Sequence, residues 1–261
     1  MPLIEDTLFG KVDKVAIAIQ RLKDYEPDDG YYLAFSGGKD SVTIKALADM
    51  AGAKYDAHYA LTTVDPPELV KFIKREHKDV KIKHPDITLW QLIVERTMPP
   101  TRMVRYCCQV LKEQGGSGRT VMTGVRQAES SKRAKRQLAE KDRKDKSKTI
   151  INPIIDWSDA DVWEFIHGYK VEYCCLYDEG WKRLGCIGCP LAGVKQQQKE
   201  FERWPKYKDA YLRSFNRMVQ ERKRRGKPCD WDTGEDVMRW WQQTAGKQAG
   251  QCDDDQSVLF E

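Results

Sequence analysis

The chain has 261 residues, of which 33% are charged, and its formal net charge is only +5. A chain of this length buries a full core as one large domain or one domain plus an appendage, which excludes extended disorder, and the near balance of acids and bases excludes a global polycation. No apolar run approaches the roughly 20 residues that span a bilayer, and the N-terminus lacks the basic-then-apolar order of a signal peptide. We therefore expect a cytoplasmic protein that does not enter a membrane.

Predicted strands and helices alternate along the chain as far as Pro190. The strands are expected at 31–35, 58–64, 80–82, 120–125 and 149–155. The helices are expected at 41–50, from 66 or 67 to 77, and at 89–95, 103–112 and 159–166. This alternation predicts an α/β fold, with a mainly parallel sheet and helices on both faces.

Beyond Pro190 the alternation stops, and residues 195–245 have the pattern of helices rich in Arg, Lys and Trp. We therefore predict two parts. Residues 1–194 form a nucleotide-binding α/β domain with a cysteine-rich metal site, and residues 195–261 form a basic helical extension with an acidic tail.

The stretch Ser36–Ser41, SGGKDS, stands between an apolar strand and a helix. Such a junction points backbone N–H groups and the positive end of the helix dipole at an anion. The two glycines leave room for phosphate oxygens, the serines add hydroxyl donors, and Lys39 adds a positive charge. Asp40 beside a phosphate implies an intervening Mg²⁺. The spacing is not that of a Walker A loop, in which four residues separate the first glycine from the Gly-Lys pair.

SGGKDS resembles the PP-loop of the ATP pyrophosphatase superfamily, whose members hold the β,γ-pyrophosphate of ATP and expose the α-phosphorus. Four further segments resemble the phosphoadenosine-phosphosulfate reductase family, so that the likeness covers residues 31–192. These segments are TTVDPPELVKFI, TGVRQAESSKRA, NPIIDWSDADVWEFI and LYDEGWKRLGCIGCPLA. The resemblance implies a Rossmann-like fold of the HUP type.

The resemblance also implies which residues bind an adenine nucleotide. They are Ser36, Gly37, Gly38, Lys39, Asp40, Ser41, Thr63, Asp65, Gly124, Arg126 and Arg133. Lys39, Asp40 and Arg126 are the expected catalytic residues, with ATP and Mg²⁺ as cofactors. The position of Arg126 fits this role because it follows the carboxyl end of a predicted strand, where ligands of open α/β sheets collect.

Six of the eight cysteines fall in two CC pairs and one CxxC motif. In a cytoplasmic chain such clustering indicates metal binding or redox chemistry rather than disulfides. Cys107, Cys108, Cys186 and Cys189 match four thiolate ligands, and the arrangement resembles the cluster-binding pattern of adenylylsulfate reductases and thiolation enzymes. A [4Fe–4S] cluster is favoured, with Zn²⁺ as the alternative.

Four cysteines remain outside this set. Three roles are open for Cys174. It could replace Cys107 as a ligand, it could carry sulfur, or it could be, together with Cys175, a small buried apolar side chain. Cys229 and Cys252 receive no role.

Two departures from assimilatory reductases decide the preferred activity. The lysine-containing loop is intact, and the chain ends QCDDDQSVLFE without the reductase nucleophile segment. We expect an enzyme that converts ATP to AMP and pyrophosphate, adenylates its substrate and transfers sulfur to it. The alternatives are a reductase of adenylyl sulfate or phosphoadenylyl sulfate, and a non-catalytic nucleotide-binding regulatory subunit.

The sequence leaves the partners open. Lys132–Lys148 and Arg203–Lys227 are basic, and Trp204, Tyr207 and Tyr211 interleave with the second stretch. This pattern suits a nucleic-acid acceptor, with a solvated helix surface, or for the first stretch a mobile loop, as the alternative. A cysteine desulfurase or another sulfur donor is a further candidate partner. The sequence does not predict the oligomeric state.

Overall fold

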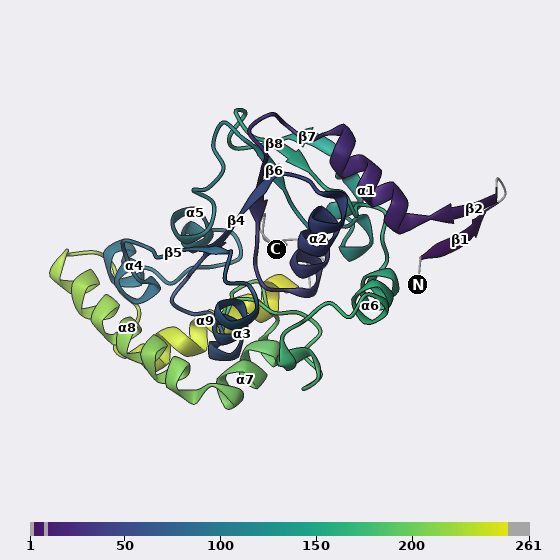
Figure 1. The fold of residues 1–261 in the computed structure, drawn as a ribbon. Coiled ribbons are helices and arrows are strands. Elements are labelled where there is room, and N and C mark those ends of the chain that lie inside the picture. Colours follow the sequence, from purple (N-terminus) through teal and green to yellow (C-terminus); the bar gives the residue numbers. More distant parts are fainter. Residues whose placement is uncertain (1–2, 8–9, 250–261) are drawn as a thin grey trace.

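A computed structural model describes residues 3–7 and 10–249, and a six-stranded sheet forms its centre (Figure 1). The strands are β3 (Tyr31–Ala34), β4 (Tyr55–Ala60), β5 (Lys81–Lys83), β6 (Thr120–Met122), β7 (Ala139–Lys141) and β8 (Thr149–Ile151). Their order in the sheet is β5-β4-β3-β6-β8-β7. All neighbours run parallel except β7, which pairs antiparallel with β8 at one edge.

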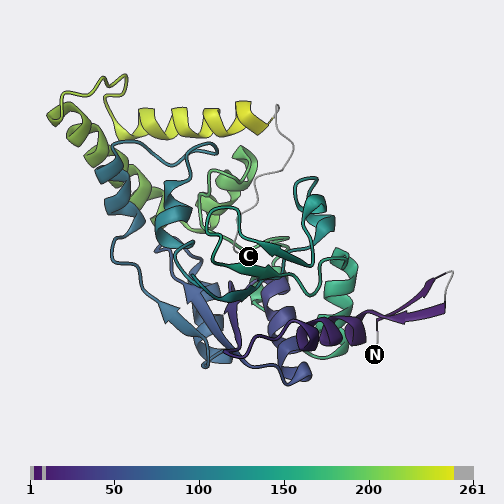
Figure 2. The ribbon, with the colours of Figure 1, turned by 90° about the horizontal axis from the view of Figure 1, so that it is seen from above.

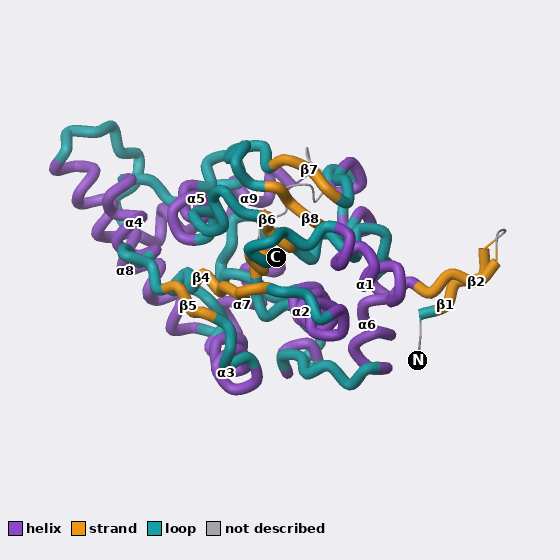
Figure 3. The backbone as a smooth tube through the Cα atoms, turned by 45° about the horizontal axis from the view of Figure 1, so that its top comes forward, coloured by secondary structure: helices purple, strands orange, loops and turns teal. Residues whose placement is uncertain are grey.

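Helices flank this sheet, as expected from the alternating pattern. Figure 3 shows α2 (Lys39–Ala51) and α3 (Pro67–Glu76) on one side of the sheet and α5 (Tyr106–Leu111) on the other. The remaining helices of the α/β part are α1 (Lys14–Asp24), α4 (Leu89–Arg96) and α6 (Asp159–Gly168), with 3₁₀ turns η1 (Gln127–Glu129), η2 (Arg133–Lys135) and η3 (Cys175–Tyr177). The predicted fold class is confirmed.

The strand order reverses at β3, which has β4 on one side and β6 on the other. Chain segments that leave the carboxyl ends of β3 and β6 therefore diverge and open a crevice between them, the usual ligand position in open α/β sheets. The loop Ser36–Ser41 follows β3, and Gly124 and Arg126 follow β6. Both predicted phosphate-binding segments thus meet at the switch point.

Two regions contain elements that were not predicted from the sequence. The N-terminal segment forms a hairpin of β1 (Ile4–Thr7) and β2 (Gly10–Asp13) that projects from the body, followed by α1 (Figures 1 and 2). The Asp13 side chain caps α1 by accepting from the N–H groups of Val15 and Ala16. The basic stretch 132–148 is neither a helix nor a bare loop, because it contains η2 and the edge strand β7.

The C-terminal extension is helical, as expected, with α7 (Val194–Arg203), α8 (Pro205–Arg224) and α9 (Gly234–Ala249). These helices share one hydrophobic core with the α/β part, since Phe215 and Trp241 belong to the same buried cluster as Ile44. The Trp241 indole donates to the Pro100 carbonyl across 2.6 Å. Within the described ranges, no helix combines the length and the apolar character needed to cross a bilayer. The predicted acidic tail, Cys252–Glu261, lies outside the described residues.

Candidate functional site

The loop Ser36–Ser41 forms a compact turn between β3 and α2. Gly37 has φ +74°, and a Cβ there would lie 2.7 Å from the Leu69 side chain, so both the backbone angle and the packing against α3 require glycine. The Ser36 and Ser41 hydroxyls lie 3.2 Å apart, and the Ser41 hydroxyl also donates to the Gly38 carbonyl. The turn is therefore fixed before any ligand arrives.

Four charged side chains converge on the first turn of α2. The Arg126 Nε donates to Asp40 Oδ1 across 2.6 Å, and its Nη2 donates to Asp159 Oδ1 across 3.1 Å. The Lys39 ammonium lies 3.2 Å from the same Asp159 oxygen and 3.6 Å from Asp40 Oδ2. Lys39, Asp40 and Arg126 are 6%, 8% and 2% exposed. The three predicted catalytic residues are thus brought together, and Asp159, the first residue of α6, is a member that the sequence did not single out.

Arg126 is engaged within the protein on all sides of its guanidinium, because Nη1 also donates to the Trp157 carbonyl at 3.3 Å. A nucleotide phosphate would have to share or displace one of these three contacts. Gly124 lies just ahead of it, and a Cβ at Gly124 would stand 2.9 Å from the backbone of Asp40. This glycine allows the loop after β6 to approach α2.

The other predicted nucleotide-binding residues occupy flanking turns. Arg133 is buried and forms an ion pair with Glu129, whose other oxygen accepts from the Arg126 backbone N–H at 2.8 Å. The Asp65 carboxylate accepts from the backbone N–H and the hydroxyl of Thr62, at 2.6 and 2.8 Å. Thr63 has the unusual φ of +70°, and its hydroxyl accepts from the N–H of Leu89. Asp65 and Thr63 therefore shape the turn after β4.

Tyr177, the last residue of η3, contacts the loop Ser36–Ser41, although it was not among the predicted site residues. Its hydroxyl accepts the backbone N–H of Lys39 across 2.8 Å. Tyr177, Arg183 and Leu184 line a small hollow together with the loop residues. Tyr177 lies in the segment LYDEGWKRLGCIGC, and nothing in this segment indicates a contact with a loop 138 positions earlier.

The four predicted metal-binding cysteines all line one cavity of about 680 Å³. Cys107 and Cys108 come from the start of α5, and Cys186 and Cys189 from a turn in which Gly188 has φ +70°. A Cβ on Gly188 would stand 2.8 Å from Phe201 and 2.9 Å from Tyr211, so helices α7 and α8 pack directly on this turn. The four cysteines that the sequence grouped together therefore line the same cavity.

The thiols differ in acidity. A hydrogen bond from Cys107 lowers the pKa of Cys108 to about 6, and the same bond raises the pKa of Cys107. Burial raises the pKa of Cys186 to about 12 and also raises the pKa of Cys189. Among the described residues, no three His, Cys, Asp or Glu side chains converge closely enough to form a site for a single metal ion. The four thiols line one cavity, and four cysteine thiolates are the ligand set of an iron–sulfur cluster.

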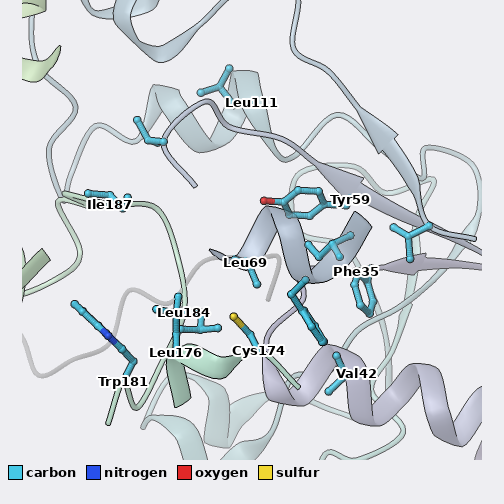
Figure 4. Packing of buried hydrophobic residues seen from close by; sticks show 14 of the residues in the cluster. Phe35, Val42, Tyr59, Leu69, Leu111, Cys174, Leu176, Trp181, Leu184 and Ile187 are labelled. Carbon is cyan, nitrogen blue, oxygen red and sulfur yellow. The ribbon is translucent and has the colours of Figure 1, made fainter. Parts of the chain in front are cut away.

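Cys174 and Cys175 lie apart from this cavity wall. Cys174 is fully buried near Leu69 and Leu176 in the hydrophobic core (Figure 4), and burial raises its pKa to about 11. Cys175 is exposed. The buried apolar role considered for the pair matches Cys174 but is wrong for the exposed Cys175, and neither residue lines the cysteine cavity.

The aromatic residues considered for base stacking have a different role. Trp204 and Tyr211 are 7% and 1% exposed, and the Tyr207 hydroxyl donates to the Asp65 carbonyl. Trp204 packs against Trp181 with ring centroids 4.9 Å apart. These rings hold the helical extension on the α/β part, so they do not form a stacking surface for nucleic acid.

The strand order and the loop at the switch point define a Rossmann-type α/β protein with a candidate phosphate site. Residues 30–192 match the phosphoadenosine phosphosulfate reductase domain, and the chain belongs to this family.

Several proteins are similar to the chain. An uncharacterized protein of Methanocaldococcus jannaschii is 31% identical over 218 residues, which cover 80% of this chain and 50% of that protein. The adenosine 5'-phosphosulfate reductase of Oceanobacillus iheyensis is 31% identical over 163 residues, covering 60% of this chain and 67% of the reductase. The chain spans half of the first archaeal relative and 39% of a second one from the same organism.

Among solved structures, the phosphoadenylyl-sulfate reductase of Candida auris, in a phosphate complex, matches with a TM-score of 0.50. The sequence identity is 16%, and the match covers 66% of this chain and 89% of that one. At this identity the likeness is one of fold.

Proposed function

We propose that the protein binds ATP at the loop Ser36–Ser41 and cleaves it between the α- and β-phosphates. The observation that carries this proposal is the charge cluster at the start of α2, where the buried Lys39 and Asp40 lie beside the exposed Asp159 at the switch point of the sheet. Backbone N–H groups at such a helix start favour phosphate oxygens. Membership of the family supports the same site.

In this proposal an oxygen of the acceptor attacks the α-phosphorus, and the bond to the bridging oxygen breaks. Pyrophosphate leaves with the electron pair, and AMP stays on the acceptor. The Lys39 ammonium neutralises the charge that develops on the leaving pyrophosphate. Arg126 orients Asp40 through the 2.6 Å contact. Asp40 and Asp159 offer the carboxylate oxygens that Mg²⁺ prefers, so these two residues would hold the ion that accompanies the nucleotide.

The cysteine cavity is the proposed site of sulfur chemistry. Cys107, Cys108, Cys186 and Cys189 would hold an iron–sulfur cluster, which when bound supplies or relays sulfur. A hydrosulfide nucleophile then takes the place of the adenylated oxygen, and AMP leaves with that oxygen. Arg183 lines both this cavity and the hollow at the phosphate loop, so the two sites share a wall.

The proposal includes a cytoplasmic location and a division of the chain after residue 194. A nucleic-acid acceptor is supported by exposed basic side chains on α8, among them Lys206, Arg213 and Arg217. A cysteine desulfurase would serve as a sulfur donor, with a thiol reductant that releases hydrosulfide from its persulfide.

The test uses protein purified without oxygen and assayed for iron, sulfide and zinc. It is then given ATP and Mg²⁺, with and without a pool of cellular RNA, and AMP and pyrophosphate are measured. Equimolar AMP and pyrophosphate support the proposal. ADP and phosphate as the products would contradict it.

A reductase is the second candidate, favoured by the similarity to the Oceanobacillus iheyensis enzyme. Release of sulfite from adenylyl sulfate in the presence of a thiol reductant would identify it. Nucleotide binding without any turnover would instead favour a regulatory subunit.

A further inference from the structure

The hydrogen bond between Lys39 and Tyr177 uses a backbone N–H donor of the phosphate loop. Lys39 is the first residue of α2, and the N-cap residue Gly38 has no side chain that caps the helix. The first N–H groups of a helix lack partners within the helix, and in a phosphate site they bind the anion. Here the Tyr177 hydroxyl accepts the Lys39 N–H at 2.8 Å.

Packing holds the Tyr177 ring in this place. Its centroid lies 5.1 Å from that of Trp163 on α6, with the rings nearly perpendicular, and 6.4 Å from that of Tyr173. The Lys39 ammonium lies 6.0 Å from the centroid of the same ring. A Cβ built on Gly38 would lie 3.5 Å from the Tyr177 hydroxyl. Tyr177 therefore lies over the start of α2 and beside Gly38.

Given the ATP site proposed above, we propose that Tyr177 competes with the nucleotide for the Lys39 N–H. Tyr177 then leaves the loop when a phosphate binds. One N–H makes one good hydrogen bond, and a charged phosphate oxygen is a stronger acceptor than a phenol. Tyr177 thus sets the affinity of the loop, because each binding event must first break the tyrosine contact.

Movement of Tyr177 off the loop also shifts residues that line the cysteine cavity. The segment that follows it carries Trp181 and Arg183, which line the cavity, and it leads directly to Cys186. Cys186 lies 3.4 Å from the Thr62 hydroxyl, in the turn that ends β4. Nucleotide binding therefore changes the wall of the compartment in which the sulfur chemistry is proposed.

The first experiment measures the binding of α,β-methylene-ATP with Mg²⁺ by calorimetry. The variant Tyr177→Phe keeps the ring and its contact with Trp163 but removes the hydroxyl. We expect it to bind about 2- to 12-fold more tightly than the wild type, the range that corresponds to one hydrogen bond of about 0.5–1.5 kcal/mol. Unchanged or weaker binding by a variant with wild-type thermal unfolding would overturn the competition.

The matched control is Tyr173→Phe. Tyr173 belongs to the same ring cluster, but its hydroxyl donates to Asp178 at 2.9 Å rather than contacting the loop. This variant should bind the analogue as the wild type does, and equal tightening in both variants would overturn the assignment to Tyr177. If neither the wild type nor the variants bind, the proposed ATP site itself fails, and with it this inference.

A second measurement follows the backbone directly by hydrogen exchange. The amide of Tyr177 donates to the Cys174 carbonyl at 3.1 Å, and the amide of Gly180 to the Tyr177 carbonyl at 3.0 Å. The analogue should accelerate exchange at both amides in the wild type while it slows exchange in the loop Ser36–Ser41. Slower exchange at both regions would show that Tyr177 stays on the loop, which contradicts the proposal.

Discussion

Arg126 and Asp40, 86 positions apart in the chain, are joined by a 2.6 Å hydrogen bond from Nε to Oδ1. The side chains are 2% and 12% exposed, so the pair is shielded from solvent. Removing one partner of a buried ion pair leaves the other charge uncompensated and costs about 3–5 kcal/mol. The pair therefore fastens the segment after β6 to the start of α2.

This relationship predicts strong non-additivity in a double-mutant cycle. Asp40→Asn and Arg126→Met should each lower the free energy of unfolding, and the double variant should lose less than the sum. We expect a coupling energy of about 1–3 kcal/mol from urea unfolding, in the range for contacting residues. Additive losses would mean that the two side chains act independently.

Lys39 is predicted to act on the leaving group. Lys39→Met keeps the side-chain length but removes the charge, and we expect about a 100-fold or larger loss of pyrophosphate release, as for other preorganised stabilising groups. Lys45→Met is the matched control on the same helix. Lys45 is similarly buried, with a 12% exposed side chain, but pairs with Asp79 at 3.0 Å. Comparable losses in both variants would contradict a specific role for Lys39.

Gly124 provides a steric test of the switch-point crevice. Gly124→Ala places a methyl group 2.9 Å from the Asp40 backbone and must push the loop after β6 away from α2. Binding of α,β-methylene-ATP, measured by calorimetry, should fall by at least about tenfold, equivalent to about 1.4 kcal/mol. Gly193→Ala is the control, because nothing lies within 4 Å of a Cβ there. Its affinity should stay at the wild-type value.

The cysteine cavity predicts which thiols bind metal. Cys108→Ser and Cys186→Ser should each lose most of the iron and sulfide, and the brown colour, of anaerobically purified protein. Cys229→Ser should retain them, since Cys229 lies outside the cavity and its thiol donates to the Trp231 carbonyl at 3.3 Å. Stoichiometric zinc in a colourless wild-type protein would remove the cluster from the mechanism.

The burial of His77 predicts that the free energy of unfolding falls at acidic pH. Burial lowers the pKa of His77, whose ring packs edge-on against Phe35 and Phe72, and Lys45 lowers it further. The unfolded chain, with a histidine pKa of about 6.5, takes up the proton first, so stability is full above about pH 6.5 and declines as the pH falls toward the lowered pKa.

The measurement for His77 is thermal unfolding between pH 7.5 and pH 5. His77→Phe should show a smaller loss of melting temperature across this range than the wild type. His84→Phe, at an exposed position, is the control and should leave the pH dependence unchanged. An equal pH dependence in the His77 variant would assign the acid sensitivity to other groups.

The sequence predicted the fold class because the alternation of apolar strands and helices is a local signal. It also grouped the four cavity cysteines by their spacing, and it placed Lys39 and Arg126 near one another through the ends of their strands. Asp159 was missed because it reads as an ordinary acidic residue in the first turn of a helix. Tyr177 was missed because its contact with Lys39 spans 138 positions and depends on how the chain returns over the loop.

The place of the aromatic residues in the second basic stretch could not be predicted for a related reason. Charge and aromatic content report composition, but they do not say which side of a helix faces inward. In α8, Tyr211 and Phe215 face the core, whereas Arg213 and Arg217 face solvent. Likewise the edge strand β7 has only three residues, two of them charged, so its sequence does not stand out from a loop.

The joint between the α/β part and the last helices predicts that the two parts unfold together as one cooperative unit. The Trp241 indole donates to the Pro100 carbonyl, and the Ser214 hydroxyl donates to the Trp90 carbonyl. A shortened chain that stopped after residue 194 would present the unprotected side of α4 to water and invite aggregation. Calorimetry of the intact protein should accordingly show a single melting transition rather than two.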